Sequence, residues 1–328
     1  MCNKILLLLI LNLLLLVANI CWGSVHIPLA DVWAALTSQA GVSEGVRFIV
    51  LQSRLPAALT ALLTGSALGV CGLLLQSYFR NPLAGPSILG ITNGANLMVA
   101  LIALCGRGGA TLAGHLTLTV LASLLGAFAI LGLLLAIGHV VRTQVTLLIV
   151  GMLLSYLTSA LITLLSYQAT AQGLQQLMLW GMGSFNGVSL SALPLYATLL
   201  LLTLSGSLWL IKPLNGWMLG EQYAQSLGFS IRRTRWMLLL ISGLLAAITT
   251  AWTGPIAFVG LSMPHVARML MRTDNHLHLL PASLLLGALC CSLCLLLSTL
   301  PSGGTLLPIN ALTPLFGIPV ILYVLLRR

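Results

Sequence analysis

Acidic residues are almost absent from this sequence. Aspartate and glutamate together account for 4 of 328 residues, and residues of either charge make up only 5%. A soluble domain carries about 25% charged residues. With 59% hydrophobic residues, this chain has too little polar surface to remain in water. The composition excludes a soluble enzyme and predicts an all-α, polytopic membrane protein, because helices satisfy their own backbone hydrogen bonds in lipid.

The four acidic residues are Asp31, Glu44, Glu221 and Asp274, and all lie between the long apolar runs. A carboxylate inside the bilayer is costly and usually relays protons or ions. Their absence from the runs argues against a secondary carrier, which stays a remote alternative. The sequence also lacks a G-x-x-x-x-G-K-[ST] nucleotide loop. We therefore expect no enzyme activity from this chain, and ATP hydrolysis would need a separate ATPase.

Signals for catalysis or metal binding are weak. The seven cysteines are an odd number, and Cys291 and Cys294 have the spacing of a metal-binding pair without the further ligands that complete a site. Ser87 and Ser262 each follow a Gly-x pair but lack the trailing glycine of a hydrolase elbow. We expect no disulfide framework, no metal and no cofactor. An intramembrane serine hydrolase is a distant alternative.

Long apolar runs fill most of the chain. A membrane-spanning helix needs about 20 apolar residues, and the eighth run is short and contains Pro264, which favours a half-span. We expect about ten transmembrane helices in a single membrane domain, residues 1–328, with an uncleaved first span. The runs lie at roughly 5–23, 57–78, 88–105, 113–137, 145–167, 190–211, 236–253, 256–271, 279–300 and 309–326.

Positive charge is unevenly distributed between the two sides of these runs. Basic residues are retained on the cytoplasmic side of a membrane. If the N-terminus is cytoplasmic and the runs alternate in direction, only Arg47, Arg54 and Arg107 fall outside. The inner residues are then Lys4, Arg80, Arg142, Lys212, Arg232, Arg233, Arg235, Arg268, Arg272, Arg327 and Arg328. This predicts a multi-pass protein of a bacterial cytoplasmic (inner) membrane with both termini inside, and it explains the net charge of +10 without nucleic acid.

Two polar breaks rich in Pro and Gly interrupt the apolar runs. One is Arg80–Pro86, and the other extends from Gly254–Gly260 to Met263–Arg268. Backbone that leaves the helix at membrane depth must be covered by protein or line a watery path, and such breaks mark the working site of transporters. We therefore expect a transporter. Nearby, His265 is predicted to be a hydrogen-bonded structural residue and His276 to be solvated.

The inner loop 212–235 carries a candidate docking element. Gly220 and Gly228 bracket a predicted short amphipathic helix. Such a helix suits the groove of a partner protein, and it also suits an interfacial position on lipid headgroups. The residues alone leave these two interpretations open. One side of the helix is predicted to carry Tyr223, Ala224 and Leu227.

Smaller patterns concern packing. A stripe of small residues on one run predicts close contact between helices, and Gln76 ends that stripe, where it is expected to face a path. Tryptophans near the ends of runs are typical interface anchors. The stripe is Ala61, Gly65, Gly69 and Gly72, and the tryptophans are Trp22, Trp180, Trp217 and Trp252.

Several motifs occur in a fixed order from about Arg54 to Arg327. They are Arg54–Pro56; Gly69–Gln76; Arg80–Pro86 followed by Leu89–Ala95; Leu219–Gly228; Gly254–Leu261 with Pro264–Arg268; and Leu307–Ile309 with Gly317–Pro319. In this order they resemble the FecCD-like permease family of ABC importers, which transport iron-siderophores, haem or vitamin B12.

The resemblance implies a vitamin-B12-importer-type permease fold with ten helices per subunit. It also implies the partners of an importer: a second permease subunit, identical or different, two ABC ATPase subunits, and an extracytoplasmic binding protein that delivers a metal chelate. Transport would proceed by ATP-driven alternating access at the dimer interface. Iron-siderophore or haem is the first substrate expectation, and cobalamin (vitamin B12) is the alternative.

The resemblance also assigns roles to residues of this sequence. ATPase coupling is expected from Gly220, Glu221, Tyr223, Ala224, Leu227 and Gly228. The cytoplasmic gate is expected at Thr143, Gln144, Val145 and Thr146. The translocation path is expected to include Gln76, Asn81, Pro82, Asn93 and Gly94.

Docking of the binding protein is less well marked. The family often has an arginine where this chain has Ala57, and an Asp, a basic residue and a Glu in the region of Leu295, Thr299 and Leu306. Two of the usual basic contacts for the acids of a binding protein are therefore missing. We expect docking to use Arg54, with Arg47 as a substitute.

Overall fold

The computed structural model describes the chain except for residues 1, 38–41, 106–115, 142, 301–305 and 327–328. The described residues are mostly helical and contain no strand. Four residues used in the charge argument, Arg107, Arg142, Arg327 and Arg328, lie outside the described part.

A helix corresponds to each of the ten apolar runs. Seven helices of the described residues are long and apolar enough to cross a membrane, and two shorter apolar helices, α5 and α15, accompany them. The helix of the eighth apolar run, α13, has 13 residues with Pro264 inside, in agreement with the short run predicted there. The ten are α1 (Cys2–Cys21), α4 (Leu55–Phe79), α5 (Ile91–Cys105), α6 (Leu116–Val140), α7 (Gln144–Tyr167), α9 (Leu193–Ser207), α12 (Ile231–Thr253), α13 (Val259–Met271), α14 (His276–Ser298) and α15 (Ile309–Leu326).

Helix α4 lies at the centre. It continues from α3 (Glu44–Phe48) through a short π-helical turn, and 83% of its most apolar stretch is buried. A helix that is apolar all round is expected to be buried. The small-residue stripe explains its closest neighbours: a Cβ placed on Gly65 would lie 2.1 Å from the Gly287 carbonyl oxygen of α14, and one on Gly72 would lie 1.7 Å from the Gly260 oxygen of α13. The predicted close packing is confirmed.

Helix α1 is exposed over most of its surface, with 17% of its apolar stretch buried. Two side-chain amides attach it to α14. Asn12 Nδ2 donates to the Leu285 carbonyl at 3.0 Å, and Asn19 Nδ2 donates to the Ser292 carbonyl at 3.0 Å. Polar side chains often join helices in this way in lipid, where the surrounding solvent offers no competing partner.

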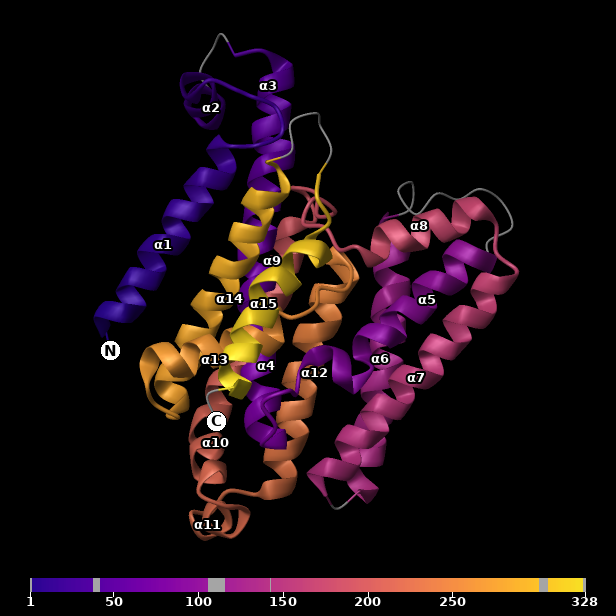
Figure 1. Cartoon of the computed structure of the whole chain (residues 1–328), viewed down its shortest axis with the longest axis vertical. Coiled ribbons are helices and arrows are strands. Elements are labelled where there is room, and N and C mark those ends of the chain that lie inside the picture. The colour runs from indigo at the N-terminus through magenta and orange to yellow at the C-terminus, as the bar shows by residue number, and fades with distance from the viewer. Residues whose placement is uncertain (1, 38–41, 106–115, 142, 301–305, 327–328) are drawn as a thin grey trace.

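The connecting elements gather at two opposite ends of the molecule. Figure 1 shows α2 (Leu29–Leu36), α3 and α8 (Ala171–Gly181) at one end, here the α8 end, and α10 (Ile211–Met218) and α11 (Glu221–Ser226) at the other, the α11 end. Helix α2 lies in the segment between the first two apolar runs. Helix α8 was not predicted.

The remaining helices form two groups. Helices α5, α6, α7 and α8 lie together on one side, and α6 packs on α12 of the central group (Figure 1). Most described cations are at the α11 end, whereas Arg47 and Arg54 are at the α8 end. Those at the α11 end are Lys4, Arg80, Lys212, Arg232, Arg233, Arg235, Arg268 and Arg272.

Candidate functional site

Glycines set both limits of α11. Gly220 has φ 124° and ψ 151°, and Gly228 has φ 85°. These are left-handed or extended mirror conformations that residues with a Cβ rarely adopt. A Cβ on either glycine would meet nothing within 4 Å, so backbone conformation rather than space requires glycine there. The predicted glycine-bounded helix is confirmed.

The predicted placement of Tyr223, Ala224 and Leu227 on one side of this helix is wrong for Ala224. Ala224 is buried at 1% exposure, whereas Tyr223 and Leu227 are 48% and 53% exposed. Ala224 therefore packs against the body of the protein, and its backbone carbonyl accepts from Phe229 N at 3.1 Å. The two larger apolar side chains face outward at the end of the molecule, which leaves them available to a partner.

The predicted gate segment lies beside α11. Gln144 Nε2 donates to Glu221 Oε1 at 3.1 Å, which joins the first residue of α7 to the first residue of α11. Thr143 caps α7, since its hydroxyl accepts from Thr146 N at 3.2 Å. Val145 is 65% exposed. Two segments that were predicted separately, at 143–146 and 220–228, are thus one connected surface.

Three of the predicted path residues share a polar cavity. Gln76, Asn81 and Pro82 line a cavity of about 360 Å³ near the α11 end, together with His265 and Arg268. Gln76 is buried, and it donates to the Leu261 carbonyl at 2.8 Å and accepts from Arg268 at 2.7 Å. His265 Nε2 lies 2.8 Å from the Pro82 carbonyl, as expected for a structural histidine.

The other two predicted path residues are elsewhere. Asn93 Nδ2 donates to the Ser155 carbonyl of α7 at 3.3 Å. Gly94 is a contact point between helices, since a Cβ there would lie 2.5 Å from the Gly126 carbonyl of α6. Both positions join α5 to its neighbours, and neither lines the polar cavity. Their place in the translocation path, which was predicted between two permease subunits, stays a prediction.

Arg54 is a structural residue, contrary to the predicted docking role. Its side chain is buried at 7% exposure. The guanidinium donates to the carbonyls of Ile20 at 3.1 Å, Cys21 at 2.8 Å and Val25. Ile20 and Cys21 end α1, and the last carbonyls of a helix have no partner within it. Arg47 is exposed, and its docking role stays a prediction.

The four positions that depart from the family pattern meet around Arg54. Ala57, Leu295, Thr299 and Leu306 line one small cavity with it, about 80 Å³ in volume. The charged side chains that the family often has at these positions, and that this chain lacks, would therefore all lie around this one cavity. What remains is a single guanidinium whose hydrogen bonds go to backbone carbonyls.

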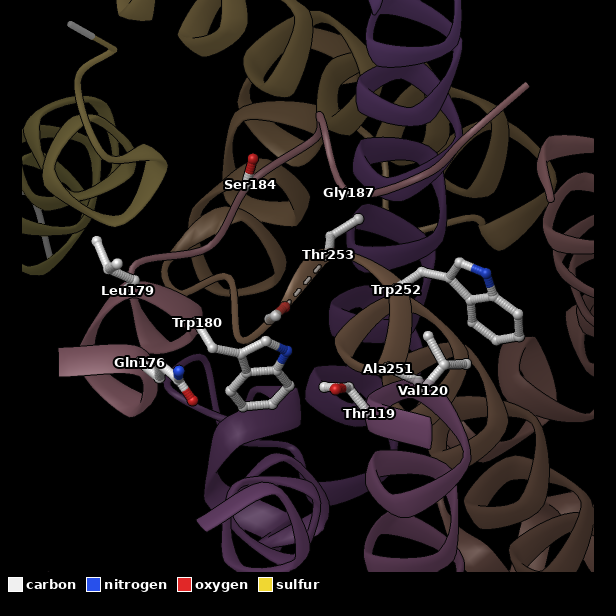
Figure 2. Close-up of a pocket in the computed structure, with 11 residues that line it drawn as sticks. Thr119, Val120, Gln176, Leu179, Trp180, Ser184, Gly187, Ala251, Trp252 and Thr253 are labelled. Carbon is white, nitrogen blue, oxygen red and sulfur yellow. Dashed lines mark hydrogen bonds between the residues drawn. The ribbon is translucent and has the colours of Figure 1, made fainter. Parts of the chain in front are cut away.

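An apolar pocket at the α8 end was missed by sequence reasoning. It has a volume of about 350 Å³ and lies between α6, α8, the end of α12 and the segment around Ser184 and Gly187 (Figure 2). Trp180 and Trp252 line it, so they are not plain interface anchors. Another of the predicted interface anchors, Trp217, is buried at 1% exposure. A tryptophan near the end of a run was the available signal, but it did not show which side the ring faces.

Among the described residues, no group of three or more His, Cys, Asp or Glu side chains is placed to hold a metal ion. Cys290, Cys291 and Cys294 are buried free thiols of α14. His276, predicted to be solvated, is 1% exposed and hydrogen-bonded on both ring nitrogens.

Known proteins resemble this chain over almost its full length. The sequence profile of the FecCD transport family matches residues 8–327. The vitamin B12 import system permease protein BtuC of Yersinia enterocolitica is 35% identical over 326 residues, which are 98% of this chain and 91% of that protein. Its counterpart in Serratia proteamaculans is 36% identical, over 90% of this chain and 87% of the relative.

One solved structure is similar in fold as well. It is described as an inward-facing conformation of an ABC transporter assigned to the metal-chelate type. It shares 30% sequence identity with this chain, covers 100% of both chains and superimposes with a TM-score of 0.86.

Proposed function

The chain belongs to the FecCD transport family, and from this premise we propose that it is the permease subunit of a binding-protein-dependent ABC importer. The observation that carries the proposal is the alignment of named import permeases along the whole chain, 98% of it in one case. Residues 1–328 act as one membrane domain without a catalytic residue. ATP is hydrolysed by separate subunits.

The α11 end faces the cytoplasm. Most described cations lie there, and cytoplasmic segments of membrane proteins carry the excess of Lys and Arg. The protein is a multi-pass component of the inner membrane of a bacterium. Its N-terminus is cytoplasmic because Lys4 lies beside the basic end of α13, where its Nζ donates to the Leu270 carbonyl at 2.7 Å. The α8 end faces outward and receives the binding protein, with Arg47 of α3 as a contact.

Helix α11 is the coupling element. Tyr223 and Leu227 project from it, and an exposed apolar pair on a short helix suits a groove on an ATPase subunit. The hydrogen bond between Gln144 and Glu221 would carry movement of α11 to the gate segment 143–146. Two permease copies are needed, with the path between them and the cavity at Gln76, Asn81 and Pro82 near its inner side.

Cobalamin is the substrate that the relatives favour. The sequence put iron-siderophore or haem first, but the similar proteins described above are named as vitamin B12 import permeases. An iron chelate is the second candidate, because the similar solved structure is assigned to the metal-chelate type more broadly.

Reconstitution tests both parts of the proposal. The permease would be placed in proteoliposomes with its ATPase and binding protein, and ATP-dependent uptake of radiolabelled cyanocobalamin would be compared with uptake of a ferric siderophore and of haem. We expect saturable cobalamin uptake that needs ATP. Uptake of ferric chelates but not of cobalamin would make an iron chelate the substrate. Uptake that follows a proton gradient without ATP would refute the importer class.

A further inference from the structure

The inner end of α4 is connected to three other helices by polar side chains. Gln76 binds Arg268 of α13, Ser77 binds His276 of α14, and Arg80 donates to the Trp217 carbonyl of α10 at 2.6 Å. α10 leads directly into α11 at the end of the molecule (Figure 1). The central, most buried helix α4 is thus joined to α10, the helix that precedes the coupling element α11.

A histidine lies at the centre of these contacts. His276 Nε2 is 2.7 Å from Ser77 Oγ of α4, and His276 Nδ1 is 2.8 Å from Asn215 Oδ1 of α10. The same Oδ1 accepts from the His276 backbone N–H at 2.9 Å. One imidazole therefore bridges α4 and α10 from the first residue of α14.

The donors and acceptors of this bridge follow from its geometry. A backbone N–H can only donate, so the Asn215 atom that faces it must be the carbonyl oxygen. The ring Nδ1, which contacts that same oxygen, must then carry a proton. A neutral imidazole has one protonated nitrogen, so Nε2 accepts from the Ser77 hydroxyl. Asn215 Nδ2 in turn donates to Asn275 Oδ1 at 2.9 Å.

Burial makes this arrangement specific. His276 is 1% exposed and Ser77 is 3% exposed. A buried polar group that loses its partner pays the full desolvation penalty. Movement of α10 along α4 would separate His276 from Ser77 or from Asn215 and so break the bridge. Trp217, two residues after Asn215, is buried against Tyr78, with ring centroids 5.7 Å apart.

We propose that His276 is the positioning residue through which movement of α11 is passed to α4 and α14. The proposal rests on the coupling role proposed above for α11. Only Leu219 and Gly220 separate α10 from α11, so a displacement of α11 reaches Asn215 first. The bridge then moves the inner ends of α4 and α14 together. His276 touches neither substrate nor nucleotide and acts through Asn215 and Ser77.

Variants of the complete complex test this role. Ser77→Ala removes one hydroxyl, Asn215→Leu removes the amide at similar size, and Asn215→Asp keeps an oxygen that accepts from His276. The matched control is His278→Asn, which lies two residues along the same helix and is half-buried. Within the part of the chain that the structure describes, its side chain makes no hydrogen bond to α4 or α10. The permease, ATPase and binding protein are reconstituted, and cyanocobalamin imported per ATP hydrolysed is measured.

We expect Ser77→Ala and Asn215→Leu to assemble and to hydrolyse ATP within about twofold of the native rate, with import per ATP lowered roughly tenfold. Asn215→Asp and His278→Asn should keep the native ratio. The double variant Ser77→Ala/Asn215→Leu should be no worse than the poorer single variant, because both act on one bridge.

A merely structural bridge would give a different result. The variants would then lower the yield and melting temperature of the complex, while the surviving complexes would import at the native ratio, and this overturns the proposal. Fully additive losses in the double variant overturn it as well. If the native complex hydrolyses ATP without importing cyanocobalamin or a ferric chelate, the proposed function fails instead, so the two failures are distinguishable.

Discussion

Substitution Gly65→Ala tests the packing at the centre of the fold. The added Cβ would lie 2.1 Å from the Gly287 carbonyl oxygen and 2.9 Å from the Ala288 Cα. Both atoms are backbone, so neither can rotate away, and α4 and α14 must part by about 1.3 Å to restore ordinary contact. Overpacking a core typically costs about 1–3 kcal/mol, and we expect the upper end because backbone is displaced.

The net effect is smaller than the steric cost. Alanine is about 1 kcal/mol better than glycine within a helix, which leaves roughly 2 kcal/mol of destabilisation. For a large domain this corresponds to a melting temperature lower by roughly 4–8 °C. The measurement is thermal unfolding of the purified protein in detergent, followed by tryptophan fluorescence.

A matched control is available on α6. A Cβ on Gly132 would meet nothing within 4 Å, so Gly132→Ala adds the same methyl group without a clash. We expect its melting temperature to be unchanged or slightly higher. If Gly65→Ala melts with the native protein, the α4–α14 contact is looser than the structure shows and the reasoning is wrong.

Three other predictions concern the two ends. Leu227→Glu should abolish co-purification of the ATPase while the melting temperature of the permease stays within about 1 °C, since the side chain is half-exposed and is not part of the buried core cluster. Retained ATPase would show that α11 does not dock. Arg54→Gln should destabilise the permease by about 1–3 kcal/mol, because the α1 carbonyls lose their donor, and it should leave the affinity for the binding protein unchanged. Arg47→Glu should instead weaken docking of the binding protein in a salt-dependent way. The reverse pattern in a binding assay would restore the docking role of Arg54. Gln144→Leu should slow import with little change in stability, because the exposed bond to Glu221 contributes about 1 kcal/mol or less, and import at the native rate would separate the gate segment from α11.

Sequence reasoning found features that local chemistry determines. The limits of α11 follow from Gly220 and Gly228, since only glycine readily adopts their conformations. The close approach of other helices to α4 follows from small residues on one helix face. The family motifs place the whole chain in one fold. In each case the signal lies within a few neighbouring residues.

Features that depend on distant partners could not be predicted. His276 sits after a polar loop and therefore looked solvated, but Asn215 and Ser77, 61 and 199 residues away, enclose it. Arg54 looked like a surface cation, because nothing near it in sequence shows that α1 ends against its guanidinium.

The face of α11 was also beyond the sequence. The helix has six residues, too few for an apolar periodicity to fix which side packs inward. The structure places the small Ala224 inward and leaves Tyr223 outside. The polar cavity and the apolar pocket arise from several helices and have no linear signal.

The attachment of α1 to α14 has a mechanical consequence. The donors Asn12 and Asn19 are seven residues apart, and so are their acceptors Leu285 and Ser292. The two helices therefore run parallel in a constant register, and a slip along either axis would break both amide bonds at once. During a transport cycle α1 should therefore move together with α14 as one rigid body, although most of its surface faces lipid. A fluorophore on the exposed thiol of Cys2, at the start of α1, would then report the displacement of α14 inside the molecule.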